Sequence, residues 1–338
     1  MMRGSSIWSN KVGNISQIGG IETSVIDNGP GRWMRIAWIN TGSGLRYKVL
    51  IDRAMDIGDA AINQYNLAWL SHAGFMPPQP FSDKGLDWLR TFGGGLVNTC
   101  GLTHVGGPEK DAHGERGIHG RISNSPAEIV SIIQPDPATR QFEMSITGIM
   151  RESNIFGPSL ELRRTISSKL GEASIHIHDE VSNKGNTPAP HMILYHCNFG
   201  WPLADAGSRL SWNGKMTTRD GQDLPNADTF MLCRDTIPEH SGSGEQVAFI
   251  DIEADADGIC KAGLHNPSLN LGVTLSFHKS ELPWLTNWQH WGLGEYVTGI
   301  EPGSHPPIGQ SKARENNTLI FLEPGAKRTY NLGIDITQ

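Results

Sequence analysis

This sequence of 338 residues predicts an all-β protein, folded as a large antiparallel sandwich with little helix. About a dozen runs rich in β-branched and aromatic residues end in Asn, Gly, Asp or Pro, which is typical of strands closed by turns. The 40 glycines and 20 prolines supply residues for many tight turns. Helical periodicity is almost absent, so we expect few helices.

The predicted strands begin with a meander and continue along the chain. The first three runs occupy residues 23–29, 32–42 and 45–53. Nine further runs predict the rest of the sandwich: 128–136, 140–152, 160–168, 173–183, 191–200, 246–255, 269–278, 317–325 and 328–335. Each run is short enough to be one strand, which favours antiparallel pairing over long crossovers.

Three segments rich in Gly, His and Trp separate these runs, at 64–121, 198–245 and 281–316. We expect them to be loops that carry the binding residues, with one short helix near SDKGLDWLRTF. No repeat, low-complexity tract or hydrophilic linker divides the chain. A single domain over residues 1–338 is therefore the expected organisation.

Charge and composition exclude several classes of partner. The net charge is -7, and no basic run offers a surface for nucleic acid. No segment is apolar enough to span a membrane, and the start MMRGSSIWSNKVGN lacks the apolar core of a secretory signal. The four cysteines form no CxxC pair. We expect a cytoplasmic protein with reduced thiols.

A glycine-rich segment, TCGLTHVGGPEKDAHGERGIHGRISNSPAE, holds His104, His113 and His119. Their spacing matches no metal-binding motif on a regular element, so we expect no metal and favour hydrogen bonding to a polar ligand. In GIHGRIS, glycines flank His119 and Arg121 follows, which suits close approach to a ligand. The alternative is that His119 is an ordinary turn residue without a ligand.

The segment WLTNWQHWGLGEYVTGIEPGSHPP combines Trp288 and Trp291 with the carboxylates of Glu295 and Glu301. Aromatic faces beside carboxylates suit a sugar, which has an apolar CH face and a rim of hydroxyls. A tryptophan-rich edge of the core is the alternative. We predict that at least one of the two tryptophans lines a sugar pocket.

In YHCNFGWPL, His196 and Asn198 stand two residues apart among aromatic side chains. The residues alone allow two interpretations: a histidine packed in the core, or an acid held in a sugar pocket.

The motifs LIDRAMDIGDA, GGGLVNTCGLTHVGG, IHGRISNSPAE, LYHCNFGWPL and GIEPGSHPP follow one another along nearly the whole chain. In this order they resemble the aldose 1-epimerase (galactose mutarotase-like) superfamily, and most closely its DUF4432 branch. The resemblance implies a galactose mutarotase-like β-supersandwich and a carbohydrate-binding site that uses neither a metal nor an organic cofactor.

The resemblance also implies roles for individual residues. His196 corresponds to the general acid, Glu301 to the general base and His119 to a sugar-binding histidine. Arg53 and Asp56 lie in a motif of the branch and are expected to contact substrate. The remaining expected substrate-binding residues are Asn198, Arg121, Trp288, Trp291 and Glu295. The aspartate of the superfamily's D-F-R segment has no clear counterpart between residues 205 and 260.

Three functions follow as hypotheses, and each has a small carbohydrate as the ligand. The sequence is compatible with a homodimer in all three. The leading one is a mutarotase that interconverts sugar anomers. A lyase or hydrolase could instead use paired carboxylates among Asp56, Glu295 and Glu301. A sugar-binding module without catalysis is the third.

Overall fold

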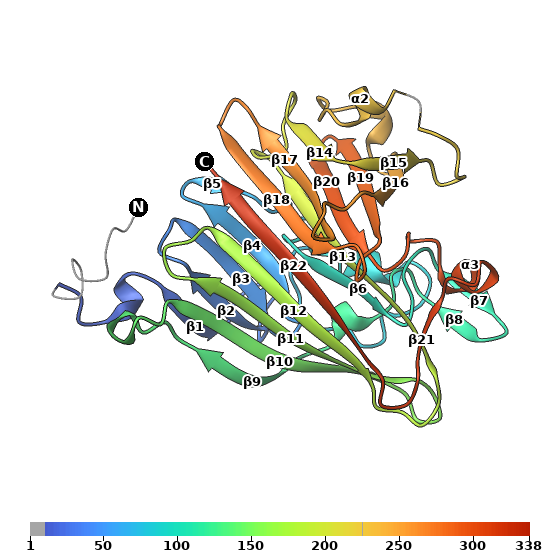
Figure 1. The fold of residues 1–338 in the computed structure, drawn as a ribbon, viewed down its shortest axis with the longest axis horizontal. Coiled ribbons are helices and arrows are strands. Elements are labelled where there is room, and N and C mark those ends of the chain that lie inside the picture. The colour runs from blue at the N-terminus through green and yellow to red at the C-terminus, as the bar shows by residue number, and fades with distance from the viewer. Residues whose placement is uncertain (1–10, 225) are drawn as a thin grey trace.

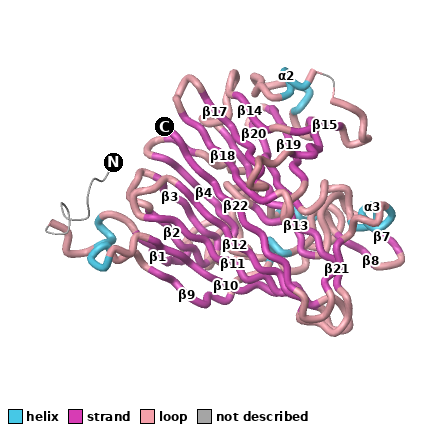
Figure 2. Tube along the Cα trace, in the orientation of Figure 1, coloured by secondary structure: helices cyan, strands magenta, loops and turns pink. Residues whose placement is uncertain are grey.

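Three antiparallel sheets and a small hairpin make up the described part of the chain, residues 11–224 and 226–338, in a computed structural model (Figure 1). The all-β architecture predicted from the sequence is confirmed. Figure 2 shows the helices as short segments outside the sheets. No described helix has the length and apolar character needed to cross a bilayer.

The largest sheet has eight strands, and its C-terminal strand β22 lies between β12 and β18 (Figure 1). In spatial order the strands are β14 (Arg209–Trp212), β17 (Ile259–Asn266), β18 (Leu271–His278), β22 (Lys327–Thr337), β12 (Ser174–Asn183), β11 (Ser159–Lys169), β10 (Glu143–Ser153) and β9 (Glu128–Ile133). Leu160 and Leu162 of β11 are buried while the residues between them are more exposed, as expected for a sheet with one face on the core.

A five-stranded meander forms the N-terminal sheet. It consists of β1 (Gly20–Val25), β2 (Arg35–Asn40), β3 (Leu45–Leu50), β4 (Asp56–Ile62) and β5 (Tyr65–Asn66). The predicted three-strand meander is thus confirmed and extended by two strands. Ile39 and Val49 of this sheet join Leu162 in one hydrophobic core, so the sheets share a common interior.

The third sheet carries the candidate site. Its order is β15 (Gly214–Thr217), β16 (Gln246–Ile252), β19 (Trp284–Gly292), β20 (Glu295–Gly303), β13 (Ala189–Gly200) and β21 (Ile320–Leu322), and β6 (Asn98–Leu102) also pairs with β13. Every residue of β13 from 191 to 200 is buried. Tyr195 and Phe199 join the main core, whereas Met192 and Leu194 pack in a second cluster under loops.

All twelve predicted runs contain a strand, but the segments predicted as loops hold further strands, including β6, β19 and β20. The short helix expected near residues 82–92 is a 3-10 helix, Asp87–Arg90. The other elements are the hairpin β7 (Glu109–Asp111) and β8 (Gly114–Arg116), helices α2 (Ala227–Phe230) and α3 (Gln310–Glu315), and 3-10 turns at Ile15–Gln17, Ile122–Asn124, Pro137–Thr139 and Pro238–His240.

Candidate active site

Strand register places the two predicted catalytic residues side by side. Cys197 of β13 pairs with Ile300 of β20, so the next positions along the two strands, His196 and Glu301, are direct neighbours. Thr286 of β19 pairs with Glu301 on its other side. Because alternate residues of a strand share a face, pairing across the sheet brings together side chains that are 105 positions apart in the sequence.

The side chains of this row point into a cavity of about 470 Å³, which we call the His196 cavity. It is lined by Trp88, Leu89, Phe92, Gly106, Gly107, Ile118, His119, His196, Arg219, Glu245, Val247, Thr286, Trp288, Glu301 and Pro307. The sheet supplies the floor, and the loops around residues 88–92 and 106–119 supply the cover. The cavity lies on the face of β13 opposite the main core.

Aromatic rings form much of the cavity wall around His196. Trp88 and Phe92 stack with ring centroids 4.3 Å apart, and Phe92 lies 5.3 Å from the imidazole of His196. Trp288 approaches the same imidazole edge-on at 5.5 Å. Such rings offer flat apolar faces to a sugar.

His119 enters the cavity from a strained turn. Its φ of 58° is left-handed, and Gly120 follows with a φ of 72°. The turn is fixed by its backbone, because the amide of His119 donates to Gly106 and its carbonyl accepts from Gly101. The ring reaches within 5.9 Å of His196, measured between centroids. Left-handed backbone at a non-glycine residue often marks a functional position.

Four buried polar atoms of the cavity residues have no hydrogen-bond partner among the described residues. They are Nδ1 of His119, Nδ1 of His196, Oγ1 of Thr286 and Oε1 of Glu301. Nε2 of His196 lies 3.2 Å from Glu301 Oε1, close but not aligned as a hydrogen bond. Buried polar atoms are normally paired, so this cluster fits a site that hydrogen-bonds a ligand.

Burial sets the protonation of the catalytic candidates. It raises the pKa of Glu301 well above its usual range and lowers the pKa of His196 to about 4. The pKa of His119 is also held well below its usual range by burial. These shifts all favour the uncharged groups, with the proton of the His196–Glu301 pair on the carboxyl group and both imidazoles neutral.

A charged pair borders the His196 cavity. An Arg219 nitrogen lies 2.5 Å from Glu245 Oε1, and the indole N–H of Trp288 donates to Glu245 Oε2 at 2.7 Å. The Arg219 side chain is 59% exposed, which places this pair at the edge open to solvent. Glu245 supplies a carboxylate within the segment where the superfamily's aspartate has no counterpart in the sequence.

Arg53 and Asp56 lie outside the cavity lining. Arg53 is buried and donates to the carbonyl of Thr91 at 2.9 Å. One carboxylate oxygen of Asp56 accepts from the backbone and hydroxyl of Thr99 and from Arg164. Both side chains bond to other protein groups, so in this structure they stabilise the packing beneath the loops. Their expected substrate contacts stay predictions.

The other expected binding residues divide between the cavity and its surroundings. Trp288 lines the cavity, while Trp291 is fully buried against Tyr296, with ring centroids 4.8 Å apart. The Asn198 amide donates to the carbonyls of Gly95 and His196 and so fixes the strand that carries His196. Its side chain does not line the cavity.

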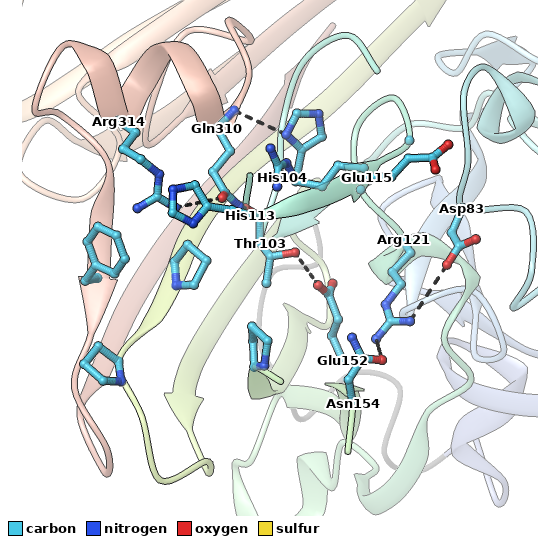
Figure 3. A pocket seen from close by; sticks show the side chains of 17 residues that line it. Asp83, Thr103, His104, His113, Glu115, Arg121, Glu152, Asn154, Gln310 and Arg314 are labelled. Atoms are coloured by element: carbon cyan, nitrogen blue, oxygen red, sulfur yellow. Dashed lines mark hydrogen bonds and ion pairs between the residues drawn. The ribbon is translucent and has the colours of Figure 1, made fainter. Parts of the chain in front are cut away.

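Arg121 faces a different depression, the Arg121 hollow, of about 410 Å³ (Figure 3). There Arg121 donates to Asn154 at 3.0 Å and lies 3.9 Å from Asp83. The buried carboxylate of Glu152 accepts from the hydroxyl of Thr103 at 2.6 Å. Figure 3 shows these groups paired with one another, in contrast to the unpartnered atoms of the His196 cavity.

Glu295 also stands apart from the catalytic pair. Its carboxylate meets His290 Nε2 at 2.9 Å and does not line the cavity. His104 and His113 border the Arg121 hollow. Within the described ranges, no three His, Cys, Asp or Glu side chains are placed to hold a metal ion.

The cavity residues that sequence reasoning missed include Trp88, Phe92, Arg219, Glu245 and Thr286. A signal existed for Thr286, because it stands two residues before Trp288 and therefore on the same face of a strand. Arg219 and Glu245 come from separate irregular segments, and nothing in their local sequence brings them together.

The sequence matches the model of one family, a domain of unknown function (DUF4432), over residues 31–336. The chain belongs to the DUF4432 family. This match agrees with the resemblance noted in the sequence. No curated protein matches the chain.

Solved structures share the fold of this DUF4432 protein. A Klebsiella pneumoniae protein named as a putative aldose 1-epimerase aligns with a TM-score of 0.86 and 24% identity, over 96% of this chain and 86% of that one. A galactose mutarotase-like protein from Clostridium acetobutylicum aligns with a TM-score of 0.63 and 13% identity, over 95% and 99%. The fold is therefore mutarotase-like.

Proposed function

We propose that this protein is a carbohydrate mutarotase, an isomerase that interconverts the anomers of a free sugar. The observation that carries the proposal is the contact of His196 and Glu301 at 3.2 Å inside a cavity where both keep an unpartnered polar atom. Neighbouring strands hold both side chains, so they form a fixed acid–base pair.

The spacing of this pair suits anomer exchange. Ring opening needs a base for the proton of the C1 hydroxyl and an acid for the ring oxygen. These two oxygens are bonded to the same carbon, so an acid and a base that serve them must also lie close together. The aldehyde then rotates and recloses with the proton roles exchanged, and the chemistry requires no cofactor.

The pKa directions favour a starting state for this cycle. Glu301 holds the proton because burial raises its pKa, and neutral His196 can accept one. Glu301 then donates to the ring oxygen while His196 takes the proton of the C1 hydroxyl. This order reverses the roles implied by the family resemblance for ring opening, and ring closure exchanges them again.

The remaining cavity groups suit a sugar's surface. Trp88 and Trp288 offer aromatic faces to CH groups, each such contact contributing on the order of 1 kcal/mol beyond area burial. The free atoms of His119 and Thr286 can hydrogen-bond hydroxyl groups. Their burial makes those bonds valuable, since an unpaired polar atom is costly.

The placement of the carboxylates argues against the hydrolase and lyase alternatives. Of Asp56, Glu295 and Glu301, only Glu301 lines the cavity. Glu245 is a second carboxylate in the wall, but Arg219 and Trp288 already engage both of its oxygens. A sugar-binding module without catalysis would use the same cavity, and kinetics separate it from a mutarotase.

The test is NMR saturation exchange between anomers across hexoses, pentoses, 6-deoxyhexoses and hexuronic acids. We expect acceleration for at least one class, lost in His196→Asn and retained in His176→Asn, a control on the exposed face of β12. Tight binding by calorimetry without acceleration would indicate a sugar-binding module. Release of a reducing sugar from glycosides would indicate a hydrolase.

A further inference from the structure

Behind the wall of the His196 cavity lies a second buried histidine, His290 of β19. It is 7% exposed, and its ring stacks on Trp288 with an interplanar angle of 11° and centroids 6.1 Å apart. Trp288 also meets the ring of His196, with centroids 5.5 Å apart. His290 therefore touches the cavity wall from outside without lining the cavity.

The hydrogen-bond partners of His290 define its protonation. Nδ1 meets the carbonyl oxygen of Gly244, and Nε2 meets Oε2 of Glu295 at 2.9 Å. A carbonyl and a carboxylate can only accept, so both ring nitrogens must donate for both bonds to form. His290 is then an imidazolium, and Glu295 is its counter-ion. The bond from His290 lowers the pKa of Glu295.

The neighbouring His240 provides an internal contrast. Its ring stacks near His290 with centroids 5.8 Å apart, but its Nδ1 accepts from the amide of Trp291 at 3.0 Å. An accepting nitrogen cannot carry a proton, so His240 is neutral in this arrangement. Burial lowers the pKa of His240, which agrees with that assignment.

We propose that the His290–Glu295 pair positions Glu245 in the wall of the His196 cavity, and that it does so only while His290 carries both ring protons. Gly244, whose carbonyl His290 holds, directly precedes Glu245 in the chain. The backbone of Gly242 also acts on the carboxylate of Glu295 and lowers its pKa, so the pair meets this loop at two points. His290 and Glu295 are positioning residues, since neither lines the cavity.

Glu245 is the point at which this support reaches the cavity. Its two oxygens join Arg219 and the indole of Trp288, so a shift of Gly244 would move both contacts. Gly292 leaves room for the pair: a Cβ atom there would lie 2.8 Å from His290 Nε2 and 3.4 Å from Glu295 Oε2. A side chain at position 292 would therefore disturb the His290–Glu295 contact, and glycine allows it.

The charged and titratable groups around His290 come from four segments. Glu295 faces it from β20, His240 from the Pro238–His240 turn and Glu245 from the loop before β16. His72 lies 3.8 Å from the other oxygen of Glu295. Arg234 and Glu239 act on His240. Glu295 is the direct ionic partner of His290, so its removal is the sharpest perturbation.

The proposal gives a direction with pH. When His290 loses a proton it keeps one donor, and one of the two bonds must fail. The support is present while His290 is charged and Glu295 ionised, and it is lost once rising pH removes one of the two ring protons of His290. The contact between the cavity wall and a sugar rests on the proposed function. The positioning of Glu245 by His290 and Glu295 does not depend on it.

Glu295→Gln provides the decisive variant. A glutamine amide can donate to Nε2 of neutral His290 while Nδ1–H still donates to Gly244, so both bonds survive without charge. The glutamine oxygen can still accept from Gly242. Glu295→Ala loses the contact in every protonation state. Glu295→Ala therefore tests whether the pair positions Glu245, and Glu295→Gln tests whether that positioning depends on pH.

The primary measurement is the indole N–H resonance of Trp288 in ¹⁵N TROSY spectra, assigned by its loss in Trp288→Phe. In the parent it should move toward the position of a free indole as pH is raised and His290 gives up one ring proton. It should stay fixed in Glu295→Gln and hold the high-pH position throughout in Glu295→Ala. No movement in the parent, or equal movement in the parent and Glu295→Gln, would overturn the proposal.

Kinetics of anomer exchange provide a second readout, with the panel sugar that the parent converts fastest. KM should rise about threefold to tenfold with pH in the parent, the scale of one lost hydrogen bond, and stay level in Glu295→Gln. Movement of kcat instead of KM would contradict a role in positioning the wall. If no sugar is converted, the mutarotase proposal fails while the resonance still decides the role of His290.

Discussion

The two faces of strand β13 differ in how their buried polar groups are hydrogen-bonded. On the core side, Tyr195 donates to Asp179 at 2.7 Å, and Arg164 makes two further bonds to the same carboxylate. Arg164 also donates to Asp56 and Thr99. One position along the chain, His196 faces the cavity with a buried nitrogen that has no partner.

This contrast distinguishes structural from functional polarity. A buried charge that is fully hydrogen-bonded holds strands together, and Arg164 is wholly buried with every neighbour supplied by the protein. The cavity atoms are held in place by the same strand but lack partners. One carboxylate oxygen of Asp56 is also unpartnered, and burial raises the pKa of Asp56 to about 6.

The largest expected effect is on catalysis. Glu301→Gln keeps the shape and hydrogen-bonding capacity of the protonated carboxyl group but cannot transfer its proton. We expect anomer exchange to slow by about a hundredfold to ten-thousandfold, with His196→Asn comparable and the double variant far from additive. Saturation exchange measures the rate, and thermal melting should be nearly unchanged.

A folded Glu301→Gln protein that kept more than about a tenth of the parental rate would contradict this role, because acid–base groups contribute at least a hundredfold. Glu245 would then be the next carboxylate to test, since it is the other one in the cavity wall.

The sequence predicted the sandwich because runs rich in β-branched and aromatic residues, closed by turn residues, identify strands. It missed β19 and β20, whose tryptophans, glycines and polar residues were interpreted as loop. These strands are covered on both faces, so the alternating pattern is absent. Glu301 was identified through family resemblance, and only the register of β20 against β13 explains its contact with His196.

The distinction between Asp56 and Glu301 could not be drawn from sequence. Both are acids in motifs shared with the family, yet one lies in a hydrogen-bonded network and the other in the cavity. Arg219 and Glu245 were missed because the pairing of β15 with β16, which a single sequence does not reveal, brings the ends of these strands together. Partners in space, which a single sequence does not reveal, decide these roles.

The second prediction tests the core side of the comparison. Arg164→Met leaves the carboxylates of Asp56 and Asp179 buried beside an apolar side chain. Breaking a buried ion pair in this way should lower the free energy of unfolding by about 3–5 kcal/mol. Urea denaturation measures the loss. A loss below about 1 kcal/mol, as for an exposed pair, would remove the structural role given to this network.

The third prediction concerns pH. Turnover needs neutral His196 and protonated Glu301, and burial moves their pKa values apart, to about 4 for His196 and well above the usual range for Glu301. The rate should fall below about pH 4, as His196 gains a proton, and again as pH rises through the raised pKa of Glu301, where Glu301 loses one. A decline beginning near pH 6.5, the ordinary histidine value, would contradict this protonation state.

The smallest expected effects come from a matched pair of substitutions, one on each side of the comparison. Thr286→Val removes an unpartnered buried hydroxyl from the cavity, whereas Thr99→Val removes a hydroxyl that donates to Asp56 and accepts from Arg164. The two changes have the same shape, so their difference reports the hydrogen bonds alone.

Thr99→Val should lower the free energy of unfolding by about 1–3 kcal/mol, because it leaves charged partners unsatisfied. Thr286→Val should leave stability unchanged or raise it slightly, since no protein bond is lost and an unpaired polar atom is removed. Thr286→Val should instead weaken sugar binding, which would appear as a several-fold rise in KM. If Thr286→Val destabilised the protein as much as Thr99→Val, its hydroxyl would have a partner in the free protein and would not be available to a ligand.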